Sequence, residues 1–448
     1  MTASNCFRLI APLFIGLMAT SSLLAQTAAV QTSYIGDHPA GNIEQGDTAL
    51  PDAPDAVQHP SAMESTQNYV PSLNGTGLFA LGDTIKTHVL IGATTSGGWD
   101  SNPDDQDNGA ASGVFVFSPY IGLQVISGKT RSLFQYQPTI QRFTLGEYSG
   151  GTMHVASLTI LHSISERWRW DFQATGNYGQ DSIRLLAPQQ TQAVGNVPGT
   201  SPQSAAYLPN AGIITYVSGE SGLHYDMSER DSVELQLSNA YSKYSELQEA
   251  SGVATSAVNY RHYISPDLNF HTYGQASYYY ESITCTSYGA GAGIDWGVGS
   301  NTSLSLAGGP QLNSKACGQQ QGFAYSAAFN TRLTETSQVY ATASRQITTT
   351  YLGPGLWQQV FTAGYQKEIA HSHTLSADIG YTSSPSTQKI SSYSGTYFDV
   401  IYCKHLGSAF STSVTYRNYS GNWGATNFNR NIAMVSLVWT PGTSHTIQ

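Results

Sequence analysis

The segment from Arg167 to Thr175 alternates polar and apolar side chains for nine residues without a break. Trp168, Trp170, Phe172 and Ala174 fall on one face of this segment, and charged, amide or hydroxyl side chains fall on the other. Because successive side chains of a strand point to opposite faces, the pattern predicts a β-strand between two different environments. Hydrocarbon on one side and water on the other is typical of a transmembrane barrel, although a single strand of this kind also fits a soluble sandwich.

The alternation recurs along the chain, for example at residues 233–238 and 268–273, and the last predicted strand runs over 431–439. Short connections are predicted at 127–130, 165–166, 228–231, 265–267, 299–301, 334–337, 370–373 and 404–408. Longer connections alternate with them at 100–111, 146–151, 181–212, 247–256, 313–321, 350–356, 383–392 and 420–428, and a short one at 284–287 breaks the trend. Short turns at one end and long loops at the other are typical of outer-membrane barrels, whose turns lie in the periplasm.

Counting strands between these connections predicts an all-β, transmembrane, antiparallel up-and-down barrel of about eighteen strands, with about sixteen as the alternative. The barrel is expected to occupy residues 84–440, followed by a C-terminal tail at 441–448. An even strand number places both chain ends in the periplasm. We therefore expect the protein in the cell outer membrane, with lipid as the partner of its outer face.

The first 83 residues have a different character. Residues 1–25 combine one positive charge, an apolar run and a small residue at Ala25, which is typical of a cleaved signal peptide. Residues 26–83 are rich in Asp and Pro and lack sustained alternation, which favours a flexible periplasmic arm. The alternatives for this arm are a plug in the lumen or a segment that docks a partner.

Composition supports the barrel and excludes one class of partner. Only 11% of residues are charged, against about 25% in ordinary soluble domains, while the 44 Gly and 28 Tyr residues suit many short strands with aromatic belts. The 29 acidic residues outnumber the 19 Lys and Arg residues, and no basic patch is visible, so nucleic acid is not an expected partner.

The polar positions of the alternating strands form a candidate pore lining. These residues are Arg167, Arg169, Asp171, Glu220, His224, Asp226, Glu234, Gln236, His271, Gln275 and Glu281. Both signs of charge occur among them, so no strong ion preference is expected. A barrel of this size normally encloses a water-filled channel, unless paired charges, loops or the arm fill it. The leading hypothesis is passive passage of small hydrophilic solutes, and walls rich in Gln and Tyr suit saccharides.

Two other classes of function stay open: a surface-binding or structural barrel that works through its long loops, and a barrel enzyme. No Gly-x-Ser-x-Gly, His-Glu-x-x-His or phosphate-loop motif occurs, so no enzyme, metal or cofactor is predicted. The segment 371–373 contains two His in a short turn, which favours a turn over a zinc site. The acidic segment 100–107 suits calcium in its oxygen ligands but lacks an EF-hand pattern, so a solvated loop is favoured.

The cysteines give a sharper prediction. Of the four, Cys6 leaves with the signal peptide, and Cys285 and Cys317 fall on the same outer side of one hairpin. A disulfide between them would close a loop of about 30 residues and stabilise the fold by roughly 3 to 4 kcal/mol in the chain-entropy model. Two unpaired thiols are the alternative. Cys403 is left over near a periplasmic turn, either buried or as a free thiol.

A resemblance to a known family is visible at the first strand. Residues 84–99, followed by Asp100, Ser101, Asn102 and Pro103, resemble the opening of outer-membrane β-barrel porins found with exopolysaccharide operons. The likeness covers roughly twenty residues closely and the rest of the chain only through its barrel pattern. It implies a role linked to exopolysaccharide export and supplies no catalytic residues.

Overall fold

The computed structural model describes residues 86–103, 109–145, 150–179, 213–245, 249–281, 284–299, 301–317, 321–350, 353–370, 372–384, 392–407, 409–423, 426–441 and 445–447. The predicted signal peptide and arm, and the whole of the long connection at 181–212, lie outside these residues. No helix within the described ranges is long and apolar enough to cross a membrane.

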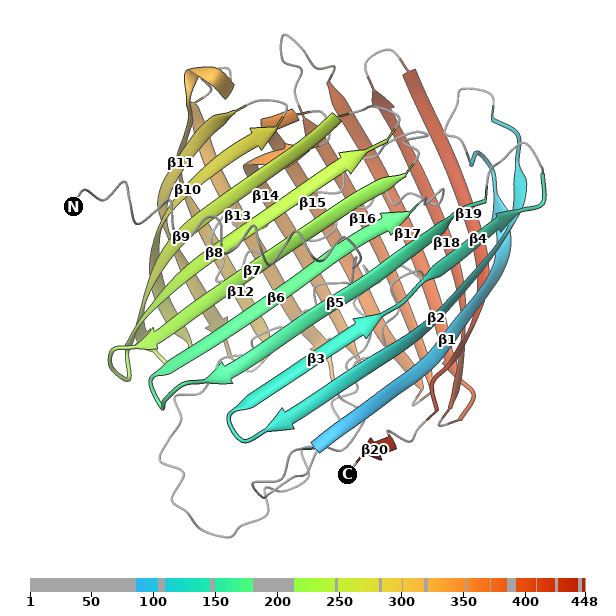
Figure 1. Ribbon diagram of the computed structural model, residues 1–448, viewed down its shortest axis with the longest axis horizontal. Helices are drawn as coiled ribbons and strands as arrows, with labels where there is room; N and C mark the ends of the chain where they lie inside the picture. Colours follow the sequence, from blue (N-terminus) through green and yellow to red (C-terminus); the bar gives the residue numbers. More distant parts are fainter. Residues whose placement is uncertain are drawn as a thin grey trace.

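Antiparallel strands account for nearly all of the described chain (Figure 1). They are β1 (Lys86–Asp100), β2 (Ser112–Ser127), β3 (Thr130–Tyr136), β4 (Thr139–Phe143), β5 (Thr152–Ser163), β6 (Trp168–Gly179), β7 (Ile214–Asp226), β8 (Asp231–Tyr244), β9 (Glu249–Ser265), β10 (Leu268–Glu281), β11 (Cys285–Val298), β12 (Thr302–Asn313), β13 (Gln321–Thr334), β14 (Ser337–Thr350), β15 (Gly353–Ala370), β16 (His373–Ser384), β17 (Tyr393–His405), β18 (Phe410–Trp423), β19 (Thr426–Trp439) and β20 (His445–Ile447). One short 3-10 helix, η3 (Lys315–Cys317), follows β12.

The strands form one closed barrel. Strand β1 pairs with β2 on one side and with β19 on the other, so the first and last long strands close the sheet. Strands β3 and β4 share one position beside β2, and β20 is a short strand next to β1, so the twenty strands make an eighteen-stranded barrel. The prediction of an antiparallel barrel of about eighteen strands is confirmed.

Large apolar side chains cover the outside of the barrel. Phe115, Leu237, Phe270, Trp296 and Val435 are each more than a third exposed, and the alternate residues of their strands are mostly buried or partly buried. A belt of this kind would be a large exposed apolar surface in water, but it matches the hydrocarbon of a bilayer. The same alternation that predicted the strands therefore also fixes which face of each strand points outward.

Three outer connections are shorter than predicted. Strand β9 begins at Glu249, β14 and β15 are separated only by residues 351–352, and β18 and β19 only by residues 424–425. The predictions of loops over 247–256, 350–356 and 420–428 are wrong for a physical reason. Alternation is required only where one face meets lipid, whereas backbone pairing extends the ladders beyond that belt.

The end of the chain also pairs. Residues 445–447 form β20, which pairs with Thr87, His88 and Val89 of β1. These residues come just before the part of β1 that pairs with β19. Part of the predicted C-terminal tail is thus a strand that continues the closing seam.

Candidate functional site

The inner face of the barrel carries most of the predicted pore-lining residues. In β8, Leu235 and Leu237 are exposed outward, so Glu234 and Gln236 point inward, and strand register extends this face to the neighbouring strands. The inward residues of β6, β7, β8 and β10 include Arg169, Asp171, Glu220, His224, Asp226, Glu234, Gln236, His271 and Gln275. Two predicted residues differ. Arg167 lies exposed in the turn before β6, and the side chain of Glu281 is outside the described part of the structure.

Neighbouring inward side chains on β6, β7 and β8 are joined in pairs. The Nε2 atom of His224 lies 2.7 Å from Oδ1 of Asp171 and 3.9 Å from Oε1 of Glu234. On the same strands, the amide of Gln236 donates to Oε1 of Glu220 at 2.6 Å. These contacts hold the side chains in place, so the part of the lumen wall formed by β6, β7 and β8 is a surface of paired charges and amides.

The ionic surface extends to both sides of this group. Arg169 lies 3.6 Å from Asp226 at the turn end of β6 and β7. On β10 and β11, the fully buried His271 lies 3.6 Å from Asp295, which also accepts a hydrogen bond of 2.6 Å from Ser305. Asp295 was not predicted, although it lies on the polar face of an alternating strand.

A second polar wall lies across the lumen on β14 to β18. Arg417 donates to Asp399 at 2.7 Å, and both side chains are buried. Asp378 stands directly opposite Asp399 in the β16–β17 register and accepts a hydrogen bond from the hydroxyl of Tyr340. None of these four residues was predicted. Asp378 and Arg417 lie on the polar faces of alternating segments, and that signal would have found them.

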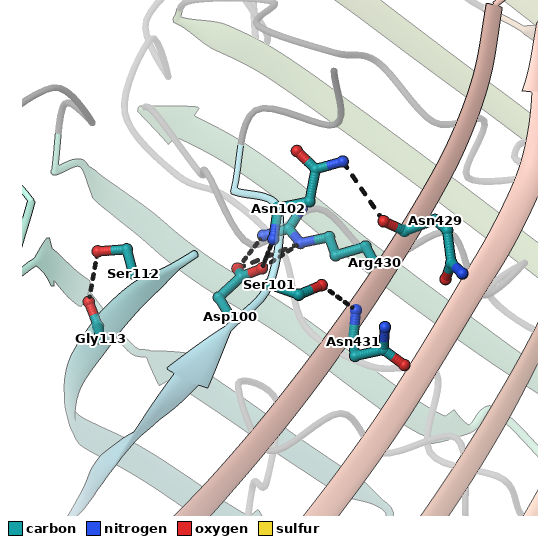
Figure 2. Close-up of polar contacts among 8 residues, drawn as sticks. All are labelled: Asp100, Ser101, Asn102, Ser112, Gly113, Asn429, Arg430 and Asn431. Atoms are coloured by element: carbon teal, nitrogen blue, oxygen red, sulfur yellow. Dashed lines mark hydrogen bonds and ion pairs between the residues drawn. The ribbon is translucent and has the colours of Figure 1, made fainter. Parts of the chain in front are cut away.

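The closing seam holds a buried ion pair (Figure 2). Arg430 of β19 contacts both carboxylate oxygens of Asp100 at the end of β1, with Nε–Oδ1 at 3.0 Å and Nη2–Oδ2 at 2.5 Å. Asn102 donates through its backbone N–H to Asp100, and its amide donates to the carbonyl of Asn429 at 3.4 Å. The hydroxyl of Ser101 accepts from the backbone N–H of Asn431 at 2.7 Å.

This seam corrects the reading of the acidic segment. Asp100 is fully buried and ion-paired, so it belongs neither to a solvated loop nor to a calcium site. Residues 104–108 of the same segment, and His371 of the other candidate cluster, lie outside the described residues. Among those that are described, no group of three or more His, Cys, Asp or Glu side chains is placed to hold a metal ion.

The outer end of the β14–β15 hairpin leaves the barrel wall. Pairing between β13 and β14 stops at Tyr325 opposite Arg345, whereas β14 and β15 stay paired as far as Thr350 opposite Gly353. Beyond Arg345, the backbone N–H of Ile347 donates to the side chain of Gln311 on β12, a strand that is not its neighbour. Both β14 and β15 also contact β9, which belongs to the opposite wall (Figure 1). The hairpin end therefore folds into the lumen.

An apolar cluster holds this hairpin end against the inside of the barrel. Ile347 and Trp357 are opposite each other in the hairpin and both are buried. They pack with side chains from six further strands, β7 to β11 and β13. These side chains are Tyr216, Ala240, Val253, Tyr279, Cys285 and Ala324. Arg345 lies 4.8 Å from the centre of the Trp357 ring. This cluster holds the hairpin end on the inner side of the wall, where it narrows the outer half of the lumen.

A disulfide borders the same cluster. The structure joins Cys285, the first residue of β11, to Cys317, the last residue of η3, with a Cα–Cα distance of 5.5 Å. Ser314 reinforces this attachment by donating its backbone N–H to the carbonyl of Thr286 at 2.9 Å. The disulfide thus attaches the β12–β13 connection to the start of β11, next to the end of the β14–β15 hairpin. Cys403 is unpaired and half-buried on β17.

The distribution of polarity decides where this barrel resides. Its outer face is apolar, its inner face holds charged and amide side chains, and every long strand has both neighbours that a closed sheet requires. Closure leaves no unpaired strand edge in the bilayer, which is the condition for a strand to span hydrocarbon. The chain is an outer-membrane β-barrel.

No protein-family model and no curated protein matches the chain. Several solved outer-membrane proteins are similar in structure. The outer-membrane protein OpdK from Pseudomonas aeruginosa is 8% identical, with a TM-score of 0.45, and the match covers 81% of this chain and 100% of OpdK. OccK2 (OpdF) from the same organism, solved with glucuronate, is 10% identical with a TM-score of 0.46, covering 81% and 100%. OccAB4 from Acinetobacter baumannii is 8% identical with a TM-score of 0.43, covering 79% and 98%.

Proposed function

We propose that this barrel is an outer-membrane channel for small hydrophilic solutes. The observation that carries the proposal is the lumen itself, in which paired charges and amides line both walls of an eighteen-stranded barrel. Barrels of this strand number enclose a lumen wide enough for an aqueous path. We infer that the centre of the lumen is left to water and solute.

The inward hairpin and the mixed charges set the expected selectivity. The end of β14 and β15 narrows the outer half of the lumen, which favours a size limit over free diffusion of large molecules. Acidic groups such as Asp171 and Asp295 alternate with Arg169 and Arg417, so fields of opposite sign partly cancel. We therefore expect a narrow channel with weak preference between anions and cations.

A link to exopolysaccharide export is the finer part of the proposal. Its support is the resemblance of residues 84–103 to porins found with exopolysaccharide operons. Deleting the gene should reduce secreted polysaccharide and leave the amount of intracellular polymer unchanged or raised. Equal secretion with and without the gene would contradict this link while leaving the channel proposal intact.

Single-channel recording in a planar bilayer tests the channel. Discrete conductance steps should appear with the refolded barrel, and none with heat-denatured protein in the same detergent. The pathway is assigned with two neighbouring variants in a Cys403→Ser background: Arg169→Cys faces the lumen, with its side chain 48% exposed, and Trp168→Cys faces outward. A water-soluble cationic thiol reagent should reduce the current of the first variant only. Silence from a folded barrel, or equal block of both variants, contradicts a lumenal path.

A further inference from the structure

Buried polar atoms without hydrogen-bond partners occur on several parts of the inner wall, and one group of them lies on β15 to β18. On β16 and β17 these atoms are Oδ2 of Asp378, Oγ1 of Thr382, the hydroxyl of Tyr397 and Oδ1 of Asp399. The neighbouring strands add Nε2 of Gln366 on β15 and Oγ1 of Thr415 on β18. All six side chains lie on the inward faces of four consecutive strands, and each is less than a tenth exposed. We call this group the β15–β18 polar cluster.

The two carboxylates of the cluster are each half engaged. Asp378 and Asp399 are direct partners in the strand register. Tyr340 donates to Oδ1 of Asp378, and Arg417 donates to Oδ2 of Asp399, so one oxygen of each carboxylate is fixed and the other stays available. Gln366 is similar, because its Oε1 accepts from Gln338 at 2.9 Å while its Nε2 has no partner. The fixed contacts orient the unused atoms.

Glycines make this arrangement possible. Tyr340 on β14 reaches Asp378 on β16 across Gly364 of β15, and a Cβ at Gly364 would overlap both side chains. The ring of Tyr397 lies over Gly380 in the same way, two residues from Asp378 on the same face. The two glycines therefore leave room for the rings of Tyr340 and Tyr397 beside the carboxylates. A side chain at either glycine would occupy the space of a ring.

An unpartnered buried polar atom costs roughly 1 to 3 kcal/mol, so a group of six calls for a reason beyond packing. The cluster mixes acceptors (two carboxylate oxygens) with a donor (the Gln366 amide) and three hydroxyls, which act as both. A cation would use only the acceptors, and an anion would meet two carboxylates with one guanidinium. A neutral molecule with several hydroxyls matches this mixture of donors and acceptors, because each of its hydroxyls also donates and accepts.

We propose that the β15–β18 polar cluster is a binding site for a neutral, hydroxyl-rich solute such as a saccharide. This inference rests on the proposed channel function and names the solute class for that lumen. The six atoms are shielded from solvent, so a side chain must move for a solute to reach them. Three side chains of the cluster, Thr382, Tyr397 and Thr415, have a hydroxyl without a partner, so their movement breaks no hydrogen bond of that hydroxyl. Tyr397 is the largest of the three, and we assign it the role of admitting the solute.

Isothermal titration of the full, folded barrel in detergent tests the site with three probes: glucose, glucuronate and choline. We expect glucose to bind and to bind more tightly than either charged probe. Tyr397→Phe removes a hydroxyl that has no partner within the barrel, so folding should be preserved while glucose affinity falls about five- to tenfold, the value of one hydrogen bond. Tyr273→Phe is the matched control, because it removes another unpartnered buried hydroxyl, on β10 and outside the cluster.

The outcomes separate cleanly. Equal glucose affinity in wild type and Tyr397→Phe, or an equal loss in Tyr273→Phe, overturns the location of the site. Tighter binding of choline or glucuronate than of glucose overturns the solute class, and absence of glucose binding overturns the inference as a whole. Because titration does not depend on current, a barrel that conducts without binding glucose keeps the channel and loses this site. A barrel that binds glucose without conducting keeps this site and loses the channel.

Discussion

The buried ion pair between Asp100 and Arg430 is the contact whose loss we expect to weaken the barrel most. It joins the first long strand to the last one, across a separation of 330 residues along the chain. Arg430→Met removes the guanidinium and keeps an apolar side chain of similar length. The carboxylate of Asp100, which is 0% exposed, then stays buried without its main partner.

The magnitude follows from this burial. Removing one partner of a buried ion pair typically costs about 3 to 5 kcal/mol, because the charge left behind has lost both water and its counterion. Replacing both partners by uncharged groups is often close to neutral, since the desolvation cost of both charges also disappears. We therefore expect Arg430→Met to lower the free energy of unfolding by about 3 to 5 kcal/mol, and the double variant with Asp100→Asn to recover most of that loss.

Urea unfolding in lipid vesicles, followed by tryptophan fluorescence, measures these free energies, and the shift in mobility on heating an electrophoresis sample reports the folded fraction. Asn431→Ala is the control, because it sits beside Arg430 on β19 while its backbone N–H keeps its bond to Ser101. A loss of less than about 1 kcal/mol in Arg430→Met would refute the reasoning, because the buried carboxylate would then be tolerated. A double variant no more stable than Arg430→Met would refute the claim that unpaired charge causes the loss.

Four further predictions address the disulfide, the hairpin, the outer face and the second wall. Replacing Cys285 and Cys317 by Ala should lower stability by about 2 to 4 kcal/mol. Reducing agent should have the same effect on the wild type and none on the variant, and equal unfolding midpoints with and without reductant would contradict this. Trp357→Ala removes the main apolar contact of the inward hairpin, so single-channel conductance should rise; unchanged conductance would show that the hairpin does not narrow the path. Leu237→Arg places a charge on the lipid face and should cost about 2 to 4 kcal/mol in vesicles, whereas Leu237→Ala should cost clearly less. Gly364→Val should destabilise the barrel by overlapping Tyr340 and Asp378, and a vesicle-unfolding midpoint equal to wild type would show that the wall can rearrange.

Much of the barrel could be read from the sequence because lipid imposes a local rule. Each strand must present apolar side chains at every second position to hydrocarbon, so segments such as 167–175 reveal strand type, facing and approximate position without knowledge of their neighbours. The short turns followed from the gaps between such segments, and most predicted lining residues lie on the inner face for the same reason. The strand ends were less predictable, because above the lipid belt no side-chain pattern is enforced.

Only the tertiary structure decided which polar residues meet. Asp100 looked like part of an acidic loop, and its partner Arg430 lies at the other end of the chain, where nothing in the local pattern links the two. The β14–β15 hairpin end turns inward because Ile347 and Trp357 pack against side chains of strands that are distant in the sequence. The carboxylates of Asp378 and Asp399 face each other because of the register between β16 and β17. Alternation along a strand is a property of neighbouring residues and is written in the sequence. Closure, register and contacts across the lumen are set when distant strands pair, and they decided the interior of this protein.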